Sequence, residues 1–170
     1  MKSYVKFFII AGLVLGGTLG MAGTFVSSDH LRSVLWAIDG TGLIAATSLL
    51  AVRFIRAGED CVAGGFIVYA IGEAVMQGGI AGSLEASVPA FAAGTALWSA
   101  ALFLTSVPKV FAIWTRVAAI VAAVLFGSVS LRVFAGADIT PLAKPLPYFA
   151  YPFLVLTFVG WIWSAAKQEC

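Results

Sequence analysis

Long apolar runs separated by short polar breaks dominate the chain. Each run is close to the ~20 residues that a helix needs to cross the hydrocarbon core of a bilayer. Lipid offers no partner for backbone N–H and C=O groups, so such runs are expected to form helices. The predicted helices cover residues 5–26, 31–54, 61–79, 88–107, 110–135 and 148–166.

Polar and turn-forming residues mark the ends of these predicted helices. Ser28 or Asp29 can cap the second helix, and Pro89 suits the first turn of the fourth. The tightest break is Pro108-Lys109, between the fourth and fifth helices. The alternative is one long kinked region, but a single helix across both segments would be far longer than one membrane span.

Composition indicates that the natural solvent of this chain is lipid. Hydrophobic residues make up 61% of the 170 positions and charged residues only 11%, whereas a soluble domain carries about 25% charged residues. We therefore predict an all-α polytopic integral membrane protein, a bundle of about six transmembrane helices in a single domain, residues 1–170. The first apolar run resembles a signal peptide, but its length favours an uncleaved membrane helix.

Charge and motif content exclude several classes of function. A formal net charge of +2, with basic residues scattered singly, does not suit a nucleic-acid-binding protein. Cys61 and Cys170 form no metal-binding pattern, and the single histidine, His30, rules out bis-histidine haem ligation within one chain. No activated nucleophile or HExxH motif is present. We predict no metal, no cofactor and no enzymatic activity.

The distribution of Lys and Arg predicts the orientation of the chain. With the N-terminus inside, most basic residues lie near the cytoplasmic side, and Arg32, Arg132 and Lys144 lie outside. This bias places both termini in the cytoplasm. Short loops without a large soluble domain favour a multi-pass protein of a prokaryotic cytoplasmic membrane.

A row of glycines at a spacing of four lies on one face of the first predicted helix. Gly12, Gly16 and Gly20 would let another helix approach closely, and close packing drives helix association in lipid. The row can serve packing within the chain. Alternatively, it can contact a second copy or a membrane-complex partner.

Two carboxylates lie inside the apolar runs at a similar depth. At 1.5 Å per residue, Asp39 lies roughly 12 Å and Glu73 roughly 9 Å below the outer boundary. Their helices are joined by a short loop and are expected to be antiparallel neighbours. Because a charge at mid-bilayer costs about 2.5–3.5 kcal/mol, such side chains usually face protein or water.

The neighbours of the two acids predict an outward-facing polar pocket. Two carboxylates close together in a medium of low dielectric constant cannot both ionise cheaply, so one is expected to hold a proton. That chemistry suits proton coupling or cation binding. The candidate ligand- or proton-binding residues are Asp39, Glu73, Gln77, Tyr69, Arg32 and Arg132.

Two functional hypotheses follow from this pattern. The first is a transporter, channel or substrate-binding membrane subunit for a small solute or ion, with its site around Asp39 and Glu73. The second is a non-catalytic accessory or assembly subunit of a larger membrane complex, in which the glycine row and the segment PLAKPLPYFAYPF, residues 141–153, would be contact surfaces. In that case the acids would be structural, with Asp39 paired to Arg32 or Glu73 donating a hydrogen bond to a neighbouring helix.

Overall fold

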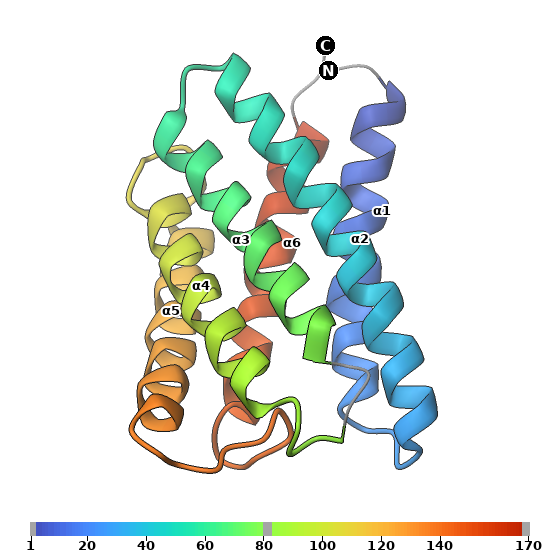
Figure 1. Ribbon diagram of the computed structural model, residues 1–170. Helices are drawn as coiled ribbons and strands as arrows, with labels where there is room; N and C mark the ends of the chain where they lie inside the picture. Colours follow the sequence, from blue (N-terminus) through green and yellow to red (C-terminus); the bar gives the residue numbers. More distant parts are fainter. Residues whose placement is uncertain (1–2, 80–82, 168–170) are drawn as a thin grey trace.

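A computed structural model describes residues 3–79 and 83–167, which form a bundle of helices (Figure 1). Within these residues there is no strand, and six helices are long and apolar enough to cross a membrane. The prediction of an all-helical fold with six helices of this kind is confirmed. The helices are α1 (Ser3–Gly23), α2 (Asp29–Arg56), α3 (Asp60–Gly79), α4 (Val88–Ser106), α5 (Ile113–Phe134) and α6 (Tyr151–Lys167), the last preceded by a short 3₁₀ turn, Tyr148–Ala150.

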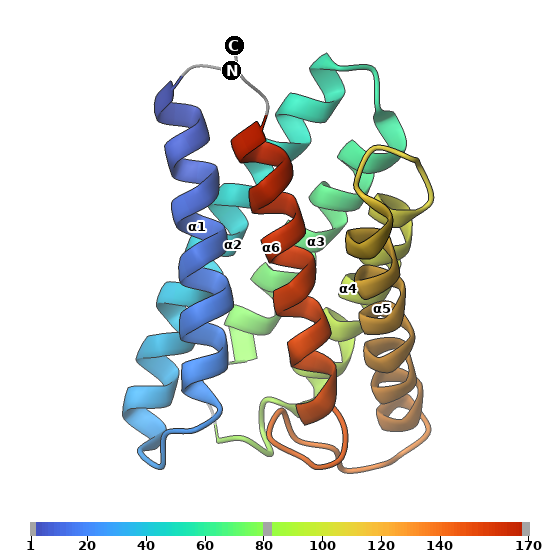
Figure 2. The ribbon, with the colours of Figure 1, turned by 180° about the vertical axis from the view of Figure 1, so that it is seen from behind.

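The helices form a closed ring in chain order. Each packs against the next along the chain, and α6 returns to pack against α1 (Figure 2). The start of α1 and the end of α6 lie at the same end of the bundle, where Lys6 Nζ donates to the Ala166 carbonyl oxygen at 2.6 Å. In this ring α5 contacts α4, α6 and the 3₁₀ turn, and it does not border α2 or α3.

The helix ends show how local sequence sets the boundaries. Ser28 caps α2, since its Oγ accepts from the Leu31 backbone N–H at 3.3 Å. The fifth helix begins at Ile113 rather than at residue 110, because Ala112 is extended (φ −56°, ψ 149°). Arg116 connects α5 to the end of α4 across this break, because its Nε donates to the Ser106 carbonyl oxygen at 2.6 Å.

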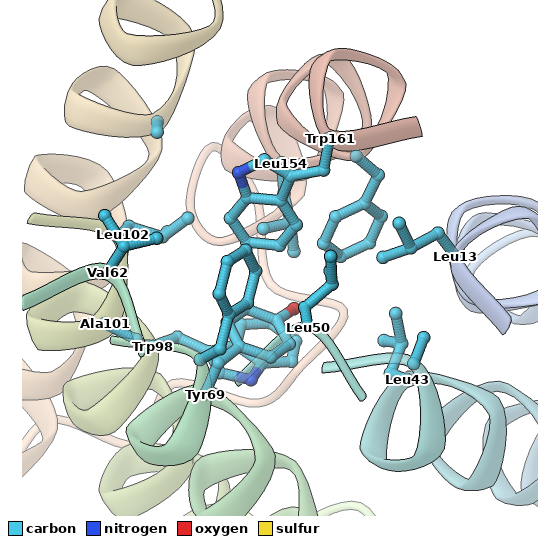
Figure 3. Packing of buried hydrophobic residues seen from close by; sticks show 14 of the residues in the cluster. Leu13, Leu43, Leu50, Val62, Tyr69, Trp98, Ala101, Leu102, Leu154 and Trp161 are labelled. Carbon is cyan, nitrogen blue, oxygen red and sulfur yellow. The ribbon is translucent and has the colours of Figure 1, made fainter. Parts of the chain in front are cut away.

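An aromatic cluster from α3, α4 and α6 fills the centre of the bundle. Trp161 lies 4.7 Å from Phe66 and 5.8 Å from Tyr69, centroid to centroid, and Tyr69 stacks on Trp98 at 5.4 Å (Figure 3). These side chains are almost completely buried. The outer surface, by contrast, exposes many large apolar side chains, such as Phe7 (65%), which is compatible with a lipid environment.

The glycine row of α1 is used for packing within the chain. A Cβ at Gly12 would collide with the Gly42 carbonyl oxygen and lie 2.8 Å from Ala46 Cβ, and a Cβ at Gly16 would overlap Leu43. Gly12 and Gly16 therefore allow α1 and α2 to approach closely. At these two glycines, the close neighbour of α1 is therefore α2.

Gly12→Ala is expected to destabilise the protein by about 1–3 kcal/mol, because the new methyl group would push α1 away from α2. A matched control is Gly64→Ala on α3, where an added Cβ meets nothing within 4 Å. Thermal unfolding in detergent should show a lower midpoint for the first variant and an unchanged or higher one for the second. Equal midpoints would contradict this packing of α1 on α2.

Candidate functional site

A cavity of about 360 Å³ lies between the helices, in the half of the bundle remote from the start of α1 and the end of α6. Side chains from α1, α2, α3, α4 and α6 contribute to its lining. Leu43, Trp98 and Leu154, all labelled in Figure 3, are among the lining residues. The volume falls within the range of about 300–1,000 Å³ typical of small-molecule sites.

Asp39 lies on the α2 wall of this cavity. Its side chain packs over Gly20 of α1, where an added Cβ would lie 2.7 Å from Asp39 Oδ2. Gly20 therefore makes room for the carboxylate. Asp39 Oδ1 is buried and receives no hydrogen bond from any described residue.

Glu73 lies on α3 at the same cavity and is only 3% exposed. Its Oε1 accepts from Gln77 Nε2 at 3.3 Å, and the same nitrogen donates to the Trp36 carbonyl oxygen at 2.9 Å. An added Cβ at Gly40 would lie 2.8 Å from Glu73 Oε1, so Gly40 is needed for this arrangement. Glu73 Oε2 is buried and has no hydrogen-bond partner in the part of the chain that the structure describes.

Neither carboxylate is neutralised by a basic side chain. Across residues 3–79 and 83–167, the one salt bridge joins Arg32 to Asp29. Arg32 also donates from Nη2 to the Val26 carbonyl oxygen at 2.6 Å. Arg32 does line the cavity, as predicted from its position on α2, but its charge is engaged by Asp29. The alternative in which Asp39 pairs with Arg32 is not observed.

Of the predicted site residues, the structure brings Asp39, Glu73, Gln77 and Arg32 together around one cavity. Tyr69 is fully buried behind them, stacked on Trp98, and does not line the cavity. Arg132 is exposed on α5 and also does not line it. Arg132 lies away from the cavity because α5 does not border α2 or α3 in the ring.

Aromatic side chains also line the cavity, and the sequence pattern does not predict them as part of the site. They come from three helices, α2, α4 and α6, and only Trp36 carries a usable signal, since it precedes Asp39 by three residues on one helical face. The Trp98 indole N–H is buried and has no hydrogen-bond acceptor among the described residues. The aromatic residues of the lining are Trp36, Phe91, Trp98, Tyr151 and Phe158.

The arrangement offers two carboxylates, each with an unused acceptor oxygen, beside a space of small-molecule size. Within the described residues no three His, Cys, Asp or Glu side chains cluster as metal ligands would. Comparison of the chain with protein-family models, curated proteins and solved structures found no match.

Proposed function

We propose that this chain is a multi-pass membrane protein that binds a small solute or ion in the cavity beside Asp39 and Glu73 and transports it. The bias of Lys and Arg supports cytoplasmic termini, and with that orientation the cavity lies in the outer half of the membrane. A small polytopic protein of this kind suits a prokaryotic cytoplasmic membrane.

The observation that carries this proposal is the pair of buried, unpartnered oxygens, Asp39 Oδ1 and Glu73 Oε2. Buried polar atoms nearly always have partners, and an unpaired one costs about 1–3 kcal/mol, more if it is charged. Carboxylates in membrane helices are retained mainly where they serve a pathway or a ligand. A solute with hydrogen-bond donors would satisfy both oxygens.

The second hypothesis, an accessory subunit of a membrane complex, receives less support. It uses the glycine row of α1 and the proline- and aromatic-rich stretch of residues 141–153 as contact surfaces, and two of those glycines, Gly12 and Gly16, already contact α2. It also gives no reason for a cavity of about 360 Å³ beside two acids.

A thermal-shift screen in detergent tests binding, because a solute that binds only the folded state raises the unfolding temperature. The screen should contain cationic, neutral and anionic small solutes. We expect one of these classes to stabilise the protein, and the same class should enter proteoliposomes faster than protein-free liposomes. If no solute of any class shifts unfolding or enters the proteoliposomes, the proposal is wrong.

Gly40→Ala is expected to weaken binding of that solute by about tenfold, the equivalent of about 1.4 kcal/mol. The added Cβ would displace the Gln77 amide and crowd Glu73 Oε1. Gly78→Ala is the matched control, because an added Cβ there meets nothing within 4 Å. Binding to both variants can be measured by titration calorimetry. Equal affinities would show that the geometry around Glu73 is unimportant for the solute.

A further inference from the structure

We propose that the cavity recognises an organic ammonium ion, a protonated primary or secondary amine that carries a compact apolar or aromatic body. This inference rests on the proposed function and names its class of solute. The charge of the cavity lining, its unsatisfied acceptors, its aromatic walls and its size all support an organic cation.

The charge of the lining is negative. Four carboxylates and one guanidinium line the cavity, and the guanidinium of Arg32 pairs with Asp29. If Asp39 and Glu73 share one proton, as expected for two close carboxylates, the lining still keeps a net negative charge. Clefts with one sign of charge concentrate ions of the opposite sign. The carboxylates of the lining are Asp29, Asp39, Glu73 and Glu85.

The unsatisfied acceptors call for a cationic hydrogen-bond donor. Asp39 Oδ1 and Glu73 Oε2 are both buried and unpartnered within the described chain. Two donors of the same lining, Arg32 Nε and the Trp98 indole N–H, are also buried without an acceptor there, and the carboxylate oxygens are the groups that an ammonium ion would satisfy. An ammonium group brings N–H donors together with the positive charge that balances a carboxylate. Hydrogen bonds between two charged groups are about twice as strong as those between neutral ones.

The aromatic walls favour an organic cation over a bare metal ion. Trp36, Trp98 and Tyr151 line the cavity near the acids, and an aromatic face attracts a cation by about 0.5–2 kcal/mol. Phe91 and Phe158 extend the apolar surface that the body of a ligand would cover. A metal ion such as Ca²⁺ takes about 6–8 oxygen ligands, whereas the described residues provide no cluster of three potential metal ligands.

The size of the cavity agrees with an organic ammonium ion as its ligand. The volume of about 360 Å³ is sufficient for an amine with one aromatic ring. The cavity therefore combines an acidic end for the ammonium group with apolar walls for its body.

Titration calorimetry in detergent with 2-phenylethylammonium tests the inference. Three analogues with the same aromatic ring separate the contribution of the positive charge from that of the N–H donors. The trimethylated ammonium keeps the charge without N–H donors, 2-phenylethanol is neutral, and 3-phenylpropanoate is an anion. We expect the primary ammonium to bind best, the trimethylated ion more weakly, and neither the alcohol nor the anion to bind.

Variants of the acids show whether binding takes place at this cavity. Glu73→Gln and Asp39→Asn should each weaken 2-phenylethylammonium binding by at least about tenfold, as expected for loss of a charged hydrogen bond. Glu59→Gln, the same change in the loop between α2 and α3 at the other end of the bundle, should leave binding unchanged. Unfolding midpoints of all variants establish that they are folded.

The outcomes separate this inference from the proposed function. If the alcohol or the anion binds at the cavity and the ammonium ions do not, the ammonium inference is wrong and solute binding stands. If neither acid variant changes the ammonium affinity, the cavity is not the ammonium site. If no compound in this set binds and the solute screen is also negative, both proposals are wrong.

Discussion

A protein that carries both Asp39→Asn and Glu73→Gln is expected to be more stable than the wild type by about 0.5–2 kcal/mol while losing its solute site. The isosteric amides keep the shape of the two side chains, and Gln77 can still donate to an amide oxygen at position 73. They remove two acids whose oxygens are buried without partners. Residues kept for binding often lower stability in this way.

The matched control changes two acids outside the apolar part of the chain. Glu59→Gln with Asp60→Asn, at the start of α3, makes the same chemical changes where one acid is partly exposed and the other is exposed. We expect this control to lose a few tenths of a kcal/mol, because it removes negative charge near a helix N-terminus. Unfolding curves in one detergent compare the variants. A clear loss of stability in the Asp39/Glu73 variant would mean that the acids hold the helices together.

Trp161→Ala is expected to destabilise the protein by about 3–5 kcal/mol, the largest effect of any single change considered. Trp161 is 1% exposed and contacts Phe66, Tyr69 and Phe158 in the central aromatic cluster. Its removal would leave a large cavity where α3 and α6 meet. Denaturation in mixed detergent, followed by circular dichroism, measures the change in the free energy of unfolding.

Trp163→Ala provides the comparison on the same helix. Trp163 is 54% exposed, and its ring lies under Lys167 Nζ at 4.4 Å from the centroid. An exposed cation–π contact is worth about 0.5–1 kcal/mol, so this variant should change stability by no more than that amount. Similar losses in the two variants would contradict the placement of Trp161 at the centre of the bundle.

The six helices could be predicted because membrane-spanning length and internal hydrogen bonding leave a segment of this composition few alternatives. The shared depth of Asp39 and Glu73 was also predictable. Their helices are antiparallel neighbours, and depth then follows from the rise per residue alone. These two facts are sufficient to place both acids, together with Gln77 one turn away, at one level.

The direction in which each helix faces could not be predicted from depth. Arg132 was chosen because it lies near the right level, but the ring order keeps α5 away from α2 and α3. Tyr69 shares a helical face with Glu73, yet stacking on Trp98 holds it behind the cavity wall. Which helices become neighbours depends on which helix surfaces fit together. The periodicity of apolar residues along one sequence does not contain that information.

Two glycines make room for polar side chains, a role that their spacing along the chain does not reveal. Gly20 belongs to the row predicted as a helix contact, but its missing side chain is what makes room for Asp39. Gly40 makes room in the same way for Gln77 and Glu73. A glycine opposite a polar side chain on a neighbouring helix can be recognised only when the pairing of the helices is known.

The most direct test of the central claim is whether a charged reagent reaches the space beside Asp39 and Glu73. In a background with Cys61→Ser and Cys170→Ser, Met76→Cys places a thiol in the cavity lining, and Ala74→Cys places one on the exposed face of the same helix. We expect the cationic reagent methanethiosulfonate ethylammonium to label position 76 much faster than its anionic sulfonate counterpart does. That preference should disappear with Glu73→Gln, and position 74, which the proposed function places against lipid, should stay unlabelled. No labelling at position 76, or equal labelling by both reagents, would contradict a solute site between the two acids.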